Sequence, residues 1–292
     1  MNNINKLVLA IGFTLTTFPT LAAGFQCKDH VVLGVPGQSS QLLCREGYAA
    51  GYNYDTKVSD WVSYRMTAAS AQGQVPRKDA FAEDKEVPVQ FRATLSDYKG
   101  SGYDRGHQAP AADMRSTANT MKQSFLLTNM TPQLPALNQG AWRILEEKTR
   151  QWAITYKSVQ VITGPIFTHS DGAIGNGVTV PHAYYRVVMD LAGKRAIAFI
   201  LPQENVSASR LADYVVTVDE VEEQTGLDFF TELPDEQEEL EEVSENLTKE
   251  TLEKKLKEAQ ERLARYEAYQ KLMEDTGASQ LSLTDADARL MK

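Results

Sequence analysis

Between Cys27 and about Pro234 the chain consists of short apolar or alternating runs separated by Gly, Pro, Asn and Asp. Three runs, 159–163, 183–189 and 196–201, are rich in β-branched and aromatic residues and predict strands. Residues 138–152 instead place apolar side chains on one side with charge between them, which predicts a helix. Segment 209–225 fits either a helix or a strand followed by a helix. This mixture predicts an α+β fold.

The composition changes after Pro234. From Glu232 onward there are 17 acidic and 9 basic residues, so this part holds −8 of the net charge of −9. A heptad seam follows at Leu252, Leu256, Ala259, Leu263, Tyr266, Gln270 and Met273. We therefore expect a domain at 24–235 and an acidic helical tail at 236–292. The tail helix either packs on the body or pairs as a coiled coil in a homodimer.

The first 23 residues have the layout of a cleaved secretory signal: Lys6, an apolar run 7–18, Pro19 and a small-residue stretch ending at Ala23. We expect an exported protein, periplasmic or secreted. The apolar run is shorter than the ~20 residues that a membrane-spanning helix needs, and no later segment approaches that length, so we expect no membrane contact.

Export would place the two cysteines, Cys27 and Cys44, in an oxidising compartment where a disulfide persists. A bridge between them would close a short loop and contribute about 3 kcal/mol on the chain-entropy model. The alternatives are weaker, because the spacing fits no zinc motif and nothing nearby provides the electropositive surroundings of a catalytic thiol.

The charge of the body gives little sign of a nucleic-acid partner. Positions 1–231 carry 22 acidic and 21 basic residues, whereas proteins that bind nucleic acid usually show a basic surface. A nuclease that turns over needs only a local positive groove with a bound metal, so the near balance weakens this function without excluding it.

The segment 103–110 carries the first chemistry. His107 has the side chain best suited to proton abstraction near neutral pH, Arg105 is a bidentate donor suited to phosphate, and Gly106 allows close backbone approach or an unusual turn. Standing alone, this unit would favour a structural histidine in a turn.

The segment 137–142 adds an oxygen ligand. The amide oxygen of Asn138 suits Mg²⁺, which takes few protein ligands and keeps most of its waters; the alternative is a helix N-cap. With Asn138 at a helix start, Glu146 lies eight residues on, about two turns along the same face, and Arg150 four residues further. The alternative for Glu146 and Arg150 is an ordinary surface ion pair.

Together, residues 104–110, 129–133 and 137–142 with Glu146 resemble the signature of the DNA/RNA non-specific endonuclease family, whose members carry a ββα-metal (His-Me) finger. Further matching segments are 60–65, 161–165, 180–185, 216–220 and 225–227. The resemblance implies a central antiparallel sheet flanked by helices, with the finger at one edge. It also implies hydrolysis of both DNA and RNA to 5′-phosphate and 3′-hydroxyl ends.

The same resemblance assigns roles. It implies that His107 is the general base and Asn138 the only direct protein ligand of Mg²⁺, with Mn²⁺ as a substitute. Glu146 would order water around the metal, and Arg105 and Arg150 would hold the phosphate. Asn129 resembles a supporting active-site asparagine, and Arg77 resembles a further phosphate-contacting arginine.

Two alternatives remain at this point. The chain could be a catalytically silent module that binds nucleic acid or protein on a nuclease scaffold. It could also be a toxin or host-interaction nuclease controlled by an inhibitor protein that binds the acidic tail.

Overall fold

The computed structural model describes residues 27–231 of the 292-residue chain. The expected signal (1–23) and the heptad tail (236–292) lie outside these residues. In the described part, no helix is both long and apolar enough to cross a membrane.

A seven-stranded antiparallel sheet forms the centre of the fold. Its strands, in spatial order, are β1 (Gln41–Cys44), β2 (Ala49–Asn53), β3 (Val58–Thr67), β6 (Ser158–Ile174), β7 (Val178–Asp190), β8 (Arg195–Pro202) and β9 (Val215–Val216). The three expected strands are confirmed as parts of β6, β7 and β8. Their β-branched and aromatic side chains fill both faces of the sheet, because successive side chains of a strand point to opposite sides.

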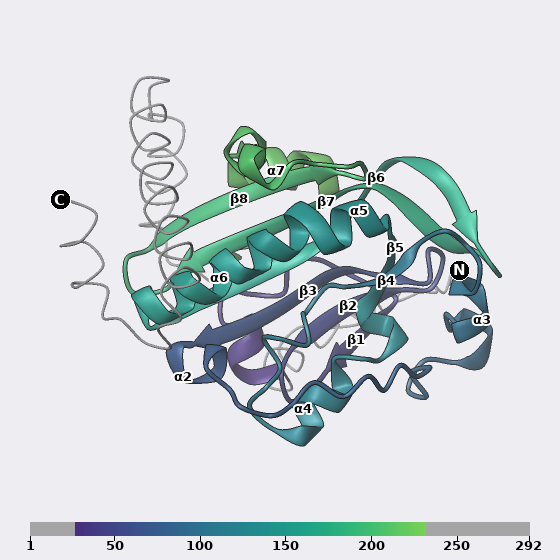
Figure 1. Cartoon of the computed structure of the whole chain (residues 1–292), viewed down its shortest axis with the longest axis horizontal. Helices are drawn as coiled ribbons and strands as arrows, with labels where there is room; N and C mark the ends of the chain where they lie inside the picture. The colour runs from purple at the N-terminus through teal and green to yellow at the C-terminus, as the bar shows by residue number, and fades with distance from the viewer. Residues whose placement is uncertain (1–26, 232–292) are drawn as a thin grey trace, which may run out of the picture.

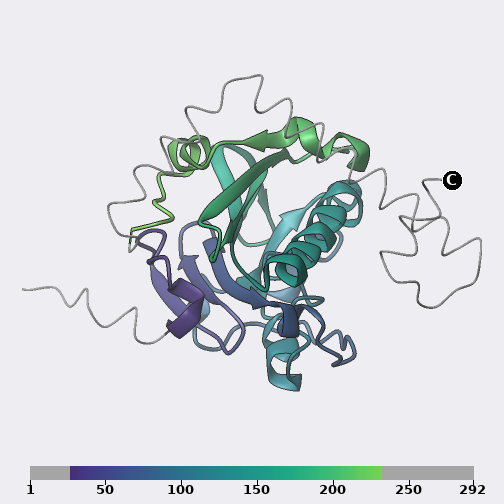
Figure 2. The ribbon, with the colours of Figure 1, turned by 90° about the vertical axis from the view of Figure 1, so that its left-hand side faces the viewer.

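The two faces are covered by different helices (Figure 2). On one face, η1 (Lys28–Val31) and α7 (Val218–Thr225) pack over Trp61, Ile162 and Tyr185. On the other, the long helix α6 (Arg143–Tyr156) lies across β3, β6 and β7. The remaining short helical segments are α2 (Ala68–Ala71), η2 (Val89–Phe91), α3 (Leu95–Tyr98), α4 (Ala118–Gln123), η3 (Leu127–Asn129) and η5 (Ala208–Tyr214).

A second, two-stranded sheet pairs β4 (Asp104–His107) with β5 (Met130–Gln133). The chain then runs through α5 (Pro135–Leu137) and the turn η4 (Asn138–Trp142) into α6, which completes a ββα unit (Figure 1). The expected position at the sheet edge is wrong. β5 contacts β3 and β7, which flank the central strand β6, so the unit lies across a face of the sheet.

The helix after β5 begins earlier than predicted. Pro135 occupies its first turn, where its missing N–H is tolerated, and Asn138 lies at the junction of α5 and η4 with helical angles. The helical path is then broken at Gly140 (φ −97°, ψ −117°). The eight-residue spacing of Asn138 and Glu146 therefore does not place them on one helix face. In segment 209–225 the second alternative is correct, because β9 precedes α7.

Cys27 and Cys44 are joined by a disulfide with a sequence separation of 17. The bridge connects the start of η1 to the end of β1, and Cys27 is buried against the face that η1 covers.

Candidate active site

The strand β4 provides the first group of candidate residues. Its pairing places Gly106 opposite Thr131 and His107 opposite Met130. A side chain at position 106 would collide with that of Gln133, so the glycine is needed for close packing inside the ββα unit. Arg105 and His107 are two residues apart on this strand and therefore project from the same face.

Two aromatic rings surround the imidazole of His107. The ring of Phe125 meets it edge-on at a centroid distance of 5.0 Å, and the ring of Phe81 lies at 5.8 Å. Nε2 is buried, and no group in the described part of the chain forms a hydrogen bond with it. Burial lowers the pKa of His107 to about 3, and the positive charges of Arg77 and Arg105 act in the same direction. The ring is therefore neutral near pH 7.

The same rings support two arginines. The guanidinium carbon of Arg105 lies 3.9 Å from the centroid of Phe81, and that of Arg77 lies 5.3 Å from Phe125. Arg77 also forms an exposed ion pair with Asp79 (2.7 Å). Among the described residues, Arg105 has no carboxylate partner. The structure thus brings together three of the predicted residues, including Arg77, whose sequence match was the loosest.

A carboxylate fixes the orientation of Asn138. Its Nδ2 donates to Oδ2 of Asp104 at 2.8 Å, and Nε2 of Gln139 donates to the same oxygen at 2.8 Å. Because a carboxylate only accepts hydrogen bonds, the amide must turn its NH₂ toward Asp104, which leaves its oxygen as a free acceptor. Asp104 belongs to the motif 104–110, but the sequence alone predicted no role for it.

This arrangement fits a hydrated magnesium ion. The described residues contain no group of three or more His, Cys, Asp or Glu that could enclose a metal. Mg²⁺ does not require such a group, because it commonly binds through one or two protein oxygens and retains its waters. The amide oxygen of Asn138 is a ligand of that kind.

Glu146 lies in the first turn of α6, with 13% of its side chain exposed. Its nearest cation is Arg186 on β7, whose Nη2 lies 3.8 Å from Oε1. Burial raises the pKa of Glu146 to about 8, although the charge of Arg186 opposes the shift.

Arg150 is paired with Asp113 and not with Glu146, the partner in the surface-pair alternative. Its Nη1 contacts Oδ1 of Asp113 at 2.8 Å, and that carboxylate is fully buried. The other oxygen of Asp113 accepts a hydrogen bond from Tyr64 (2.7 Å), and Nη1 of Arg186 donates to the same Tyr64 hydroxyl (3.2 Å). The expected alternative of a surface pair between Glu146 and Arg150 is therefore not what the structure contains.

Sequence reasoning missed Arg186, Asp113 and Tyr64. A signal was available for Arg186, since it is a charged residue inside a strand whose neighbours are apolar or aromatic, and such a residue must be paired when buried. Tyr64 lies within the matching segment 60–65, but nothing in the sequence connects it to Asp113, 49 positions away.

Asn129 is completely buried. Its Nδ2 donates to the carbonyls of Ala109 and Ser124, and its Oδ1 accepts from the backbone N–H of Ala109. The side chain thus joins the loop after His107 to the end of α4, which fits a supporting position and not contact with a substrate.

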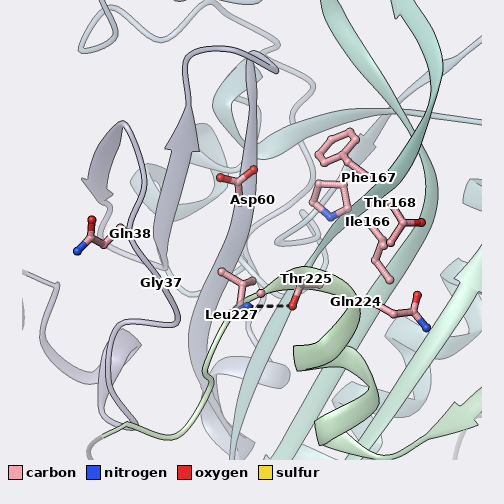
Figure 3. A pocket seen from close by; sticks show the side chains of 11 residues that line it. Gly37, Gln38, Asp60, Ile166, Phe167, Thr168, Gln224, Thr225 and Leu227 are labelled. Carbon is pink, nitrogen blue, oxygen red and sulfur yellow. Dashed lines mark hydrogen bonds between the residues drawn. The ribbon is translucent and has the colours of Figure 1, made fainter.

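A hollow of about 510 Å³ lies on the face covered by η1 and α7 (Figure 3). It is lined by Gly37, Gln38, Asp60, Pro165, Ile166, Phe167, Thr168, Gln224, Thr225, Gly226 and Leu227. None of the predicted site residues is among them. The predicted site residues therefore lie outside this hollow.

The fold and these residues define a class: an α+β protein whose ββα unit holds a neutral histidine, two arginines and an oriented asparagine. The family model described as DNA/RNA non-specific endonuclease matches residues 28–236. The chain belongs to this family, which makes it an endonuclease of the hydrolase class and indicates a divalent metal cofactor.

Individual relatives agree with this assignment. Nuclease C1 of Cunninghamella echinulata var. echinulata is 37% identical over 68% of this chain and 86% of its own length. The mitochondrial endonuclease G of Homo sapiens is 36% identical over 67% and 71%, respectively. The nuclease of Serratia marcescens is 30% identical over 79% and 91%. The solved complex of EndoG with EndoGI contains a chain that is 30% identical, with a TM-score of 0.68, over 75% of this chain and 95% of that one.

Proposed function

We propose that this protein is an exported, Mg²⁺-dependent endonuclease that hydrolyses DNA and RNA with His107 as general base. The observation that carries the proposal is the composition of the ββα unit. β4 holds a neutral imidazole beside its own Arg105 and beside Arg77 of the loop after α2, and Asp104 of the same strand orients the amide of Asn138. Phosphodiester hydrolysis needs a base, positive charge at the phosphoryl oxygens and a metal ligand, and this unit supplies all three.

In the reaction, His107 accepts a proton from a water molecule. Because Nε2 is buried, the nitrogen that faces this water is Nδ1. The water oxygen forms a bond to phosphorus while the bond from phosphorus to the 3′ oxygen breaks. A solvent proton completes the 3′-hydroxyl, and the phosphate remains on the 5′ side. Arg105 and Arg77 hold the phosphate and stabilise the charge on its oxygens.

The oxygen of Asn138 would hold the metal, and Mn²⁺ would serve in place of Mg²⁺. When bound, the ion supplies positive charge that offsets the negative charge developing at the scissile phosphate. Glu146 of α6, which Arg186 links to the backbone beside His107, would order water at the site. Arg150, which is held by Asp113, would add to the positive potential at the scissile phosphate.

The same groups explain the expected breadth of substrate. Contacts to phosphate and sugar carry no base information, and a water nucleophile has no need of the 2′-hydroxyl. DNA and RNA would therefore both be cut. The match to the family described as DNA/RNA non-specific endonuclease supports this breadth of substrate.

The deciding experiment compares cleavage of supercoiled plasmid and of RNA by the mature protein and by His107→Ala, each with Mg²⁺ and with excess EDTA. Wild type should degrade both substrates only with metal, and the variant should lose about 10²–10⁴-fold in rate. His30→Gln, on the opposite face of the sheet, is the matched histidine control and should stay active. A folded but inactive wild type would instead favour the silent scaffold.

Export is proposed from the sequence of residues 1–23. Relatives named as mitochondrial occur in the same family, so family membership does not decide the compartment. N-terminal sequencing of the protein recovered from periplasm and medium should find a start at Ala23 or Gly24. An uncleaved protein that stays in the cytoplasm would contradict export.

Two protein partners are proposed. A homodimer through the heptad helix predicts that deletion of 236–292 leaves turnover intact and lowers the oligomeric state in sedimentation. An inhibitor protein is supported by the solved complex of EndoG with EndoGI. If the inhibitor binds the acidic tail, the deletion should abolish inhibition; if it binds over the ββα unit, inhibition should persist.

A further inference from the structure

Arg186 occupies the middle of β7 and is fully buried. Its guanidinium lies between two segments that the proposed function uses. Nη2 is 3.8 Å from Oε1 of Glu146 and 3.5 Å from the carbonyl oxygen of Gln108, the residue after His107. Its remaining neighbours are Tyr64, which accepts from Nη1, and the ring of Trp142, 5.1 Å from the guanidinium carbon.

Burying a guanidinium costs free energy unless protein groups replace the hydrogen bonds that it made with water. These bonds are only partly replaced here, because Nε of Arg186 has no hydrogen-bond partner in the described part of the chain. An apolar residue would fill a position in the middle of a strand at lower cost. The presence of a charge therefore points to a requirement beyond packing.

The two arginines near α6 serve different carboxylates. Arg150 is bound at 2.8 Å to Asp113, which is itself held by Tyr64. Arg186 is left as the cation next to Glu146. Tyr64 contacts both Asp113 and Arg186, so it holds one end of the Arg186 guanidinium. The other end, Nη2, lies next to Glu146.

We propose that Arg186 is a positioning residue that fixes the carboxylate of Glu146 for the cleavage reaction. The proposal rests on the proposed function, in which Glu146 orders water at the site. It adds a residue outside the matching sequence segments and gives it a route of action through one carboxylate. Groups that orient a residue at a metal site commonly change activity by about 10–100-fold when they are removed.

The test is a double-mutant cycle on kcat for plasmid cleavage with Mg²⁺. Arg186→Gln alone should lower kcat by about 10–100-fold with little change in KM. In the Glu146→Gln background the same substitution should lower kcat by less than about twofold, because the group it positions is already gone. Arg186→Lys, which keeps the charge, should recover most of the activity in the first background only.

Arg45→Gln is the matched control. Arg45 is also buried, with 3% of its side chain exposed, and pairs with Asp84 and Glu86, neither of which belongs to the ββα unit. This substitution should lower the thermal midpoint without lowering kcat at 25 °C. If Arg186→Gln does not fold, the cycle is run with Arg186→Lys, whose smaller loss in kcat should likewise vanish with Glu146→Gln.

Equal losses of kcat from Arg186→Gln in both backgrounds would overturn the proposal and leave Arg186 a structural residue. So would full activity of Arg186→Gln, or of Glu146→Gln alone. Failure of the proposed function looks different, because wild type itself would then show no metal-dependent cleavage.

Discussion

The two halves of the site hold their charges in different ways. Around His107, the guanidinium groups of Arg77 and Arg105 lie over the rings of Phe125 and Phe81. Around Glu146, basic and acidic side chains lie within 4 Å of each other, as in the pairs Arg150–Asp113 and Arg186–Glu146. An aromatic face attracts a cation but does not neutralise it. Arg105, which has no carboxylate partner among the described residues, therefore keeps its positive charge available for a phosphate, whereas Arg150 and Arg186 each have an acidic neighbour and Arg77 is paired with the exposed Asp79.

This difference predicts that the aromatic half contributes more to cleavage and the paired half more to stability. Substitutions in the aromatic half should therefore lower mainly kcat/KM, and those in the paired half mainly the free energy of unfolding.

Among the substitutions that test this comparison, Arg105→Ala should have the largest effect. Removing a cation that faces the reacting phosphate should lower kcat/KM for plasmid cleavage by about 10²–10³-fold, with little change in the thermal midpoint. Arg105→Lys should lose less, because charge remains while the planar fork is lost. If Arg150→Ala reduced kcat/KM more than Arg105→Ala did, the comparison would be reversed.

Tyr64→Phe tests the paired half. The substitution removes the hydroxyl between Asp113 and Arg186 and leaves both without that partner, so the free energy of unfolding in urea should fall by roughly 1–3 kcal/mol. Tyr52→Phe, which removes one bond to the carbonyl of Phe91 (2.9 Å), should lose only about 1 kcal/mol. Equal losses for the two variants would mean that the network adds nothing beyond a single hydrogen bond.

Phe81→Leu examines the ring beneath Arg105. The substitution keeps an apolar side chain but removes a cation–π contact of about 0.5–2 kcal/mol, so kcat/KM should fall by several-fold up to about tenfold while the unfolding midpoint changes little. Phe81→Tyr preserves the ring and should restore activity. No recovery with tyrosine would show that shape, and not the π face, is what matters.

Asp60, on the opposite face, is a partly buried carboxylate with no ion-pair partner among the described residues. Burial raises its pKa to about 6, and hydrogen bonds from Asn53 oppose the shift. The folded protein binds this proton more tightly than the unfolded chain, so the ionised group lowers stability above about pH 6, and this effect disappears as the pH falls toward 4. Asp60→Asn removes the ionised group, so we expect it to raise the free energy of unfolding at pH 7.5. The gain should be only about 1 kcal/mol, since the group is partly exposed to solvent. A gain of the same size at pH 4.5 would exclude titration of Asp60 as the cause.

The sequence predicted the elements whose signal is local. Strands β6, β7 and β8 follow from runs of β-branched and aromatic residues, and α6 follows from the spacing of Ala141, Leu145 and Trp152. The start of the helix was misplaced because Asn138 looked like a cap, although Pro135 begins the helix. The break at Gly140 and the placement of the ββα unit across the sheet depend on tertiary packing, to which short-range patterns are insensitive.

For the candidate site, motifs identified His107, Arg105, Asn138 and Glu146, which lie on or beside the ββα unit. They did not identify what holds these residues. Asp104 reaches Asn138 over 34 positions, and Tyr64 reaches Arg186 over 122. Such contacts arise only when the chain folds, so no spacing in one sequence reveals them.

The main sheet ends in two very short strands, β1 with four residues and β9 with two. A sheet edge offers its unpaired N–H and C=O groups to any neighbouring chain, and long edges are sites of aggregation. Here each edge provides only a few such groups, and the disulfide at Cys44 anchors the end of β1. Pairing of these edges with the strands of a second molecule is therefore disfavoured.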